Sequence, residues 1–496
     1  MTIVQGPSWT RPGLDVAAGR YPLSVERHVM RTVELLVPGV TTVTPHARYY
    51  ALHALVAVEA TRRGLTTAET QQLLRRAEVT LAAVYYAHDH AHDHAGAGFP
   101  RAHGMGTLAK WLSSGEVDLD EVSQPGRDGY ARSAWGFWNP YAASEIALEI
   151  LQPEKFLTPG NSCDENAVRD GLDGLLDLAR RRRLVVDELS AHGELCVCAG
   201  GNAPDGRWLA RLLCSPVVDE DGRSRDTARH ETIRLLTRTM QTHPVRNATG
   251  DVGSAVAFGD FITTDPVAAS LSVAQAWRGV MLRNYAVGAW RRLWSWLVGQ
   301  VNGTISVDEL ADRFADELPD TTVAAFLDEL PATVTATGAP APAEQQLRDS
   351  DGPPPRRELA VLAVGARRID ELTGRARDAF LGRQYDVELG PRWTARRLDE
   401  AHSLSLRDFA QHLTRELVTR SQRIALSKAR PRLDGSLWLP TRLHQRGELL
   451  FKTSDEGGGE VGLRFDRLTT VLAGAGVVRR VDGMWQVTPD GEALLG

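Results

Sequence analysis

Hydrophobic positions at helical spacing dominate the first two thirds of the chain. In residues 23–37 and 45–63, apolar side chains recur three and four positions apart, which places them on one face of a helix. Pro38-Gly39 separates the two segments as a turn signal. A third helix is predicted over 67–86 by the same spacing. We therefore expect an α-rich body over residues 1–330.

One stretch of this body has the pattern of strands. Residues 195–218 combine short apolar runs with turn signals at Gly200-Gly201 and Asp205-Gly206, and they predict a small β insertion. Cys196 and Cys198 lie two positions apart in it, so a strand would present both on one face. Buried free thiols are the expected state of these two residues, with metal binding as the alternative.

Residues 331–357 differ from their surroundings in composition. They are rich in Pro, Ala, Thr and Gly, and the triplet Pro353-Pro354-Pro355 lies near their end. Such a composition is typical of a linker or an exposed loop, so we predict a domain boundary here. Helical periodicity resumes beyond it, which predicts a basic helical segment over 358–430.

The pattern near the C-terminus predicts a helix, a hairpin and a second helix. Residues 463–473 are amphipathic. The strand-like runs 477–480 (Val-Val-Arg-Arg) and 485–487 (Trp-Gln-Val) flank Asp482-Gly483, a dipeptide typical of a two-residue hairpin turn. A short last helix is expected after Thr488.

This order of elements resembles the recognition helix, wing and closing helix of a winged-helix domain, which implies that fold for residues 431–496. By the resemblance, Arg464 and Arg467 would face a DNA groove. Arg479 and Arg480 would lie on the wing near phosphates. These four arginines are the predicted nucleic-acid-binding residues.

Residues 36–50 carry a second resemblance. The rigid Pro-Gly turn is followed by a helix that opens with Arg48-Tyr49-Tyr50. The segment resembles part of large bacterial proteins found in phage-defence gene neighbourhoods, and this implies antiviral defence as the biological context. In structural terms, we expect the turn to pack two helices together and the tyrosines to fill the joint.

Composition sets limits on these predictions. With 496 residues, 43% hydrophobic and 24% charged, the chain is expected to fold into more than one globular domain. The net charge is −6, yet the part from Arg356 onward has a basic excess, which favours nucleic acid there. Neither a spanning apolar run nor a signal-peptide pattern occurs, so we predict a cytoplasmic protein without a membrane partner.

The most conspicuous chemical motif is the run His88-Asp89-His90-Ala91-His92-Asp93-His94. On a continued helix, His88 would pair with His92 and His90 with His94, a spacing that can hold zinc or nickel. We expect instead a solvated helix end. The alternative is a metal-dependent hydrolase that uses His88, His90, His92 and His94 as ligands.

Other motifs in the sequence do not meet the requirements of the sites they resemble. His230-Glu231 begins a zinc-protease motif, but Arg234 stands where its second histidine should be. The glycines of 457–462 match a dinucleotide-binding pattern that requires a βαβ unit, and none is predicted there. No phosphate-binding P-loop pattern is present. Neither a catalytic residue nor a cofactor is therefore predicted.

The sequence predicts a mostly α, multidomain fold, with a helical N-terminal body, a small β insertion and a C-terminal winged-helix-like α+β module. The expected function is a nucleic-acid-associated accessory or sensor component of a bacterial anti-phage defence system. Its expected partners are double-stranded DNA and other proteins of that system. A metal-dependent hydrolase and a protein-binding scaffold remain the alternatives.

Overall fold

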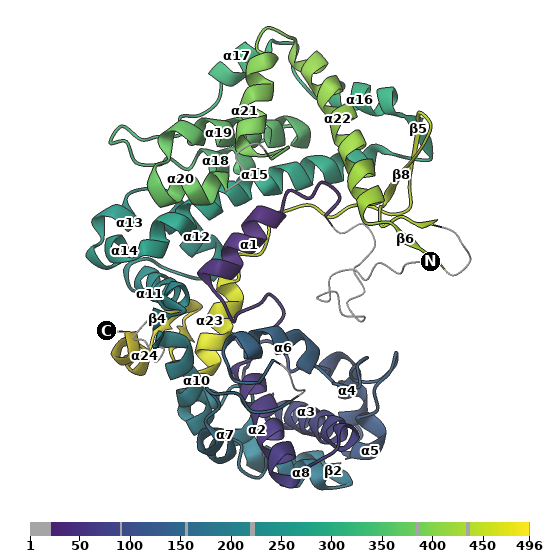
Figure 1. Ribbon diagram of the computed structural model, residues 1–496. Helices are drawn as coiled ribbons and strands as arrows, with labels where there is room; N and C mark the ends of the chain where they lie inside the picture. The colour runs from purple at the N-terminus through teal and green to yellow at the C-terminus, as the bar shows by residue number, and fades with distance from the viewer. Residues whose placement is uncertain are drawn as a thin grey trace. The chain divides into compact units, whose positions relative to one another are not determined.

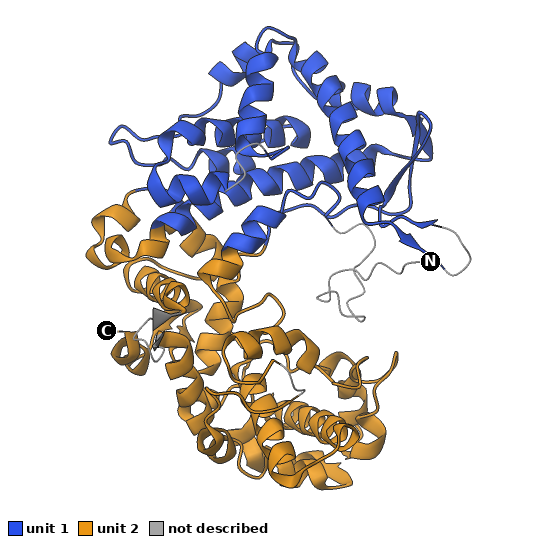
Figure 2. Ribbon diagram, viewed as in Figure 1, with its two compact units in different colours: residues 1–32, 257–259, 275–461 blue, residues 33–256, 260–274, 462–496 orange. Residues whose placement is uncertain are grey.

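The computed structural model describes residues 21–89, 92–153, 157–218, 224–382, 387–432 and 437–495. Within these ranges the fold is mostly helical, and its sheets have two or three strands (Figure 1). The chain forms two compact units (Figure 2). Unit 1 comprises residues 1–32, 257–259 and 275–461, and unit 2 comprises 33–256, 260–274 and 462–496. The predicted class, mostly α and multidomain, is confirmed.

Three helices, α1, α12 and α15, have residues in both units and are described with the unit that holds most of each. The helices of unit 1 are α1 (Arg27–Leu36), α15 (Ser272–Gln300), α16 (Val307–Asp316), α17 (Val323–Asp328), α18 (Ala343–Asp349), α19 (Pro354–Glu371), α20 (Gly374–Leu381), α21 (Pro391–Glu400) and α22 (Leu406–Ser427). Its strands are β5 (Thr304–Ser306), β6 (Arg430–Pro431), β7 (Leu437–Trp438), β8 (Leu443–Arg446) and β9 (Leu449–Lys452).

The α-helices of unit 2 are α2 (Ala47–Arg63), α3 (Thr67–Asp89), α4 (Met105–Leu112), α5 (Leu119–Val122), α6 (Trp138–Ala147), α7 (Glu165–Gly171), α8 (Leu175–Arg180), α9 (Val186–Leu189), α10 (Pro204–Cys214), α11 (Thr227–Thr242), α12 (Gly253–Ala257), α13 (Phe261–Thr264), α14 (Pro266–Ser270), α23 (Phe465–Gly474) and α24 (Pro489–Leu495). Two 3₁₀ turns, η1 (Ser190–Leu195) and η2 (Gly200–Asn202), and a π turn, η3 (Ala248–Val252), complete its helical parts. Its strands are β1 (Glu116–Asp118), β2 (Arg183–Val185), β3 (Val217–Val218), β4 (Ser224–Arg225), β10 (Val478–Val481) and β11 (Met484–Val487).

The core of unit 1 lies around α15. This helix is apolar on most of its circumference, and such a helix is stable in water only when it is buried. The side chains of Trp277, Trp290 and Trp294 are at most 2% exposed. Elsewhere in the unit, α16 packs on α22 and α19 packs on α21.

The segment predicted as a linker, 331–357, lies inside unit 1 and not at a boundary. It contains α18, and its proline run forms the first turn of α19. Proline is favoured at that position because the first helical N–H has no partner within the helix. The buried guanidinium of Arg368 also binds this segment, through the Glu344 carboxylate at 2.7 and 2.9 Å and the Ala341 carbonyl. The local sequence shows the prolines, but it does not show that Arg368 contacts this segment.

The chain from 431 to 496 is divided between the two units. In unit 1, β9 pairs antiparallel with both β8 and β5, with Leu450 opposite Ile305. In unit 2, α23, the β10–β11 hairpin and α24 follow one another as the sequence predicts, with Val478 opposite Val487. The helix, the hairpin and the closing helix are therefore present as predicted, whereas 431–461 belongs to another compact unit.

Two long helices, α2 and α3, form the centre of unit 2. The first ends at Gly64, which adopts a left-handed conformation (φ 62°) that glycine tolerates best. The second begins with a capping box, in which Thr66 and Glu69 each accept a hydrogen bond from the backbone N–H of the other. Almost every residue of α2 up to Ala60 is buried, so other elements cover it on all sides.

The predicted β insertion at 195–218 is wrong for most of its length. Residues 200–202 form η2, and Pro204–Cys214 is α10. Asp205-Gly206, interpreted as a turn, lies in the first helical turn behind Pro204, and the buried residues Trp208, Leu209 and Leu213 follow helical spacing. Only Val217–Val218 forms a strand, β3, paired with β4. In the described ranges, no helix combines the length and the apolarity that crossing a membrane would need.

The buried ion pair of unit 1 gives a test of this account of residues 331–357. Glu344→Gln should lower the free energy of unfolding by about 3–5 kcal/mol, because it leaves the buried Arg368 charge without its principal partner. Denaturant-induced unfolding of the full chain measures the loss. The matched control is Glu400→Gln, which breaks an exposed pair with Arg397 and should cost less than about 1 kcal/mol. Equally small effects of both changes would contradict this role of Arg368.

Candidate metal centre

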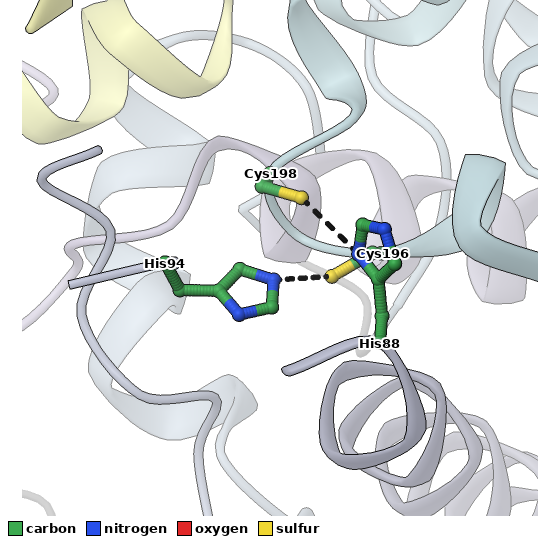
Figure 3. Close-up of side chains that lie close together, drawn as sticks. All are labelled: His88, His94, Cys196 and Cys198. Carbon is green, nitrogen blue, oxygen red and sulfur yellow. Dashed lines mark hydrogen bonds between the residues drawn. The ribbon is translucent and has the colours of Figure 1, made fainter. Parts of the chain in front are cut away.

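Four side chains with metal-binding atoms converge in unit 2 (Figure 3). The Cys₂His₂ cluster consists of His88, His94, Cys196 and Cys198. One potential ligand atom from each residue lies within 4.8 Å of all the others. The two segments that supply them are distant in sequence, since Cys196 follows His94 by 102 positions. Tertiary folding alone brings these residues together.

The distances within the cluster suit a small tetrahedral ion. His94 Nε2 lies 3.2 Å from Cys196 Sγ, and His88 Nδ1 lies 3.6 Å from Cys198 Sγ. A zinc ion with ordinary Zn–S and Zn–N bond lengths places neighbouring ligand atoms about 3.3–3.8 Å apart. His94 and Cys196 are buried, while His88 and Cys198 are half-buried.

Local structure explains how the histidines reach the cluster. His88 lies in the last turn of α3, which ends at Asp89. His94 therefore belongs to the following turn, and the i,i+4 pairs of a continued helix do not form the cluster. His94 is 1% exposed, so the predicted solvated helix end is wrong for this residue. The His92 ring stacks on that of His88 at 5.6 Å, but its side chain is exposed and lies outside the four-residue group. His90 lies outside the described residues.

The cysteines lie between two short 3₁₀ turns and not on a strand. Cys196 follows η1 directly, and Cys198 lies two residues before η2. In the sequence, the histidines and the cysteines form two separate groups of candidate ligands. The sequence does contain a pair of histidines and a C-x-C pair, which are both candidate metal ligands. Neither pair indicates that the fold brings the two together.

Arg48, from the Arg-Tyr-Tyr segment at the start of α2, fixes the cysteine loop. Its fully buried guanidinium donates hydrogen bonds to the carbonyls of Glu194 and Cys196 and, through Nη2, to the carbonyl of Gly171 at 3.2 Å. The buried Asp205 carboxylate balances its charge, with Oδ2 3.2 Å from Nε. These contacts of the Arg48 guanidinium thus fix the backbone at Cys196.

A carboxylate orients the buried histidine of the cluster. The His94 nitrogen that faces away from Cys196, Nδ1, lies 2.7 Å from Asp89 Oδ1. Metal-ligating histidines commonly use their second nitrogen in this way, which fixes the tautomer and the orientation of the ring. Burial alone would lower the pKa of His94, but hydrogen bonds to Cys198 and Asp89 raise it above its ordinary value.

The same contacts favour a thiolate at Cys198. A hydrogen bond from Cys196 and the nearby histidine His94 lower the pKa of the Cys198 thiol to about 4, against the effect of burial. The Cys196 pKa is raised, because this hydrogen bond and burial both favour its neutral form. Thiolates are the form of cysteine that binds metals.

A second cluster of titratable side chains lies wholly inside unit 2. His53 Nδ1 is 2.6 Å from Glu145 Oε1, and His53 Nε2 is 3.3 Å from Glu78 Oε1. Tyr130 donates to Glu78 and Trp138 donates to Glu145, so both carboxylates have further partners. Burial would lower the pKa of His53, but the two carboxylates raise it to about 9. The group is saturated with internal contacts, and we interpret it as a polar core.

The four arginines predicted to bind nucleic acid have different environments. Arg464 Nη1 donates to the Val40 carbonyl at 2.7 Å, and Arg467 Nε donates to the Thr42 carbonyl at 2.9 Å. These two side chains attach α23 to the turn at 40–42. Arg480 lies over the Trp485 ring, with 5.9 Å from its guanidinium carbon to the ring centroid, whereas the Arg479 side chain is exposed.

The buried polar core predicts a pH dependence of stability. The pKa of His53 is raised in the folded state, so its stabilisation is complete below about 6.5 and is lost as the pH rises to about 9. The free energy of unfolding should therefore fall between pH 6.5 and 9. His53→Gln should be less stable at pH 6.5 by about 3 kcal/mol, because two buried carboxylates lose their cationic partner. Equilibrium unfolding at several pH values tests this, and an unchanged slope in His53→Gln would contradict it.

Residues 36–50 place two buried tyrosines behind the Pro-Gly turn. Tyr49 and Tyr50 are at most 1% exposed, and the Tyr50 hydroxyl donates to Thr44 Oγ1 at 3.1 Å. The tyrosines thus fill the joint behind the Pro-Gly turn. The resemblance of this segment to phage-defence proteins, like that of the C-terminal elements to a winged helix, stays a prediction. Comparison of the chain with protein-family models, with curated proteins and with solved structures found no match.

Proposed function

We propose that this protein binds Zn²⁺ through the Cys₂His₂ cluster and that the ion has a structural role. The observation that carries the proposal is the meeting of four ligand atoms, from segments about a hundred positions apart, within 4.8 Å. Two cysteine sulfurs and two imidazoles form a donor set that selects zinc over the hard cations Mg²⁺ and Ca²⁺.

The number of ligands supports a structural ion in preference to a catalytic one. Catalytic zinc sites use three protein ligands and keep one position open for water or substrate. Here four protein ligands are available, which completes a tetrahedron. The alternative of a metal-dependent hydrolase that uses His88 to His94 is therefore less well supported than a structural site.

An ion at this place would organise the surroundings of the C-terminal hairpin. Both loops that carry ligands pack closely on the C-terminal elements of unit 2. A Cβ built on Gly201 would lie 2.9 Å from the Gly476 Cα, and one on Gly98 would lie 2.5 Å from the Trp485 ring. Such approaches leave no room for side chains, so the position of the loops and that of the hairpin depend on one another.

Metal analysis of purified protein tests the proposal. We expect one zinc ion per chain, and Cys196→Ser/Cys198→Ser should lose it. The matched control is Cys163→Ser/Cys214→Ser, which changes the other two cysteines and should keep the ion. Chelation should lower the melting temperature of the wild type by at least about 5 °C, because a ligand that binds only the folded state stabilises it. Wild-type protein without stoichiometric metal would contradict the proposal.

As a second candidate function, we propose association with nucleic acid, in the antiviral context that the resemblance of residues 36–50 implies. Arg479 supports it, because this exposed side chain on the hairpin forms no ion pair with any residue that the structure describes. A cation at this position suits a phosphate contact of a wing. Arg464 and Arg467 support it less, since backbone carbonyls already occupy them.

Duplex binding at several salt concentrations tests the second candidate. Arg479→Glu should weaken binding and flatten the log–log salt slope by about one unit, because one phosphate contact is lost. The control is Arg132→Glu, another exposed arginine of unit 2. Duplex affinity that is the same in wild type and Arg479→Glu would contradict a role of the hairpin in DNA binding. The protein-binding scaffold would then be the better supported function.

A further inference from the structure

A cavity of about 480 Å³ lies beside the metal centre in unit 2. Its walls come from the turn after His94, the loop that carries Cys198, and the β10–β11 hairpin with the start of α24. The residues that define its chemistry are Phe99, Cys198, Asn202, Arg479, Arg480 and Asp490. We propose that this cavity binds a phosphate-bearing nucleotide, either free or as a unit of a single strand.

The size of the cavity fits such a ligand. Binding sites for small molecules and cofactors commonly have volumes of about 300–1,000 Å³. At about 480 Å³, this cavity has room for a nucleotide and is too large for a lone phosphate ion to fill. A ligand that fills the cavity would place a base in it as well as phosphate groups, and both need partners among the lining residues.

Two arginines on adjacent positions of β10 supply the phosphate partners. Arg479 is exposed, and Arg480 is half-buried, with its guanidinium over the Trp485 ring and its Nε donating to the Gly483 carbonyl at 3.3 Å, which leaves its terminal nitrogens for a phosphate. Neither forms an ion pair with a residue in the described part of the chain. The exposed Asp490 opposes an anion at the rim, so the formal charge of these side chains remains +1. One guanidinium group can donate two parallel hydrogen bonds to two oxygens of a phosphate, which contributes to both affinity and orientation.

Two other lining residues offer partners for a base. Phe99 is half-buried and lines the cavity, and an aromatic side chain is a stacking partner for a base. Such stacking contributes about 1–3 kcal/mol to binding. Asn202, from the loop that carries Cys198, is exposed, and its amide can both donate to and accept from the edge of a base.

The metal centre supports one wall of this cavity. Cys198 belongs both to the Cys₂His₂ cluster and to the cavity lining, and Phe99 follows the cluster residue His94 by five positions. The inference therefore rests on the proposed structural zinc site. The two have separate readouts, because metal content and ligand binding are measured on the same samples by different methods.

Titration calorimetry with the full zinc-loaded chain tests the inference. The probes are adenosine triphosphate, inorganic pyrophosphate and a 5′-phosphorylated single-stranded oligonucleotide. Arg479→Glu/Arg480→Glu should weaken all three by tenfold or more, roughly, whereas Arg132→Glu should not change them. Phe99→Ala should weaken the nucleotide and the oligonucleotide about tenfold and leave pyrophosphate unchanged, because only a base can stack. Asn202→Ala, at an exposed position, gives the same comparison with little risk to folding.

The outcomes separate the possibilities. Tighter binding of the oligonucleotide than of the free nucleotide, with a steeper salt dependence, identifies a single strand as the source of the ligand. The reverse order identifies a free nucleotide. Zinc-loaded wild type that binds none of the probes, or binds them equally well in both arginine variants, overturns the inference and leaves the zinc site standing. Protein without zinc overturns the proposed function itself.

Discussion

The buried guanidinium group of Arg48 is the interaction on which the candidate site of unit 2 depends. It donates to three carbonyl groups from two separate segments and is balanced by one buried carboxylate, Asp205. The segment from 190 to 202 has no long helix or strand of its own. Buried carbonyls in such a segment need partners, and a charged donor supplies them strongly. The placement of Cys196 follows from this one side chain.

Close backbone packing joins this segment to the C-terminal elements of unit 2. Gly200 and Gly201 lie against Gly474 and Gly476, at distances that would not admit a Cβ. Gly476 also adopts a positive φ of 81°, which favours glycine over other residues. The loop that carries Cys196 and Cys198 and the hairpin therefore form one packed structure. This explains why a cavity at their junction has walls from three distant parts of the sequence.

Much of the local structure could be predicted because its causes are local. The helices α2 and α3 follow from apolar spacing, a capping box and a glycine stop. The β10–β11 hairpin follows from Asp482-Gly483 between two strand-like runs. At 195–218 the prediction differs from the structure because Asp205-Gly206, interpreted as a turn, lies in the first turn of a helix. At 331–357 it differs because proline has two uses. Pro204 and Pro354 begin helices, and a local pattern does not distinguish this from a break.

The sequence by itself determined the fold class and most helices, since periodicity, caps and turn residues act over a few positions. Tertiary structure alone decided the Cys₂His₂ cluster, because no local rule connects His94 with a cysteine 102 positions later. It also decided the roles of the C-terminal arginines. Arg464 and Arg467 meet backbone carbonyls far away in sequence, whereas Arg479 remains exposed. Long-range contacts assign these roles because hydrogen bonding and burial depend on which segments the fold brings together.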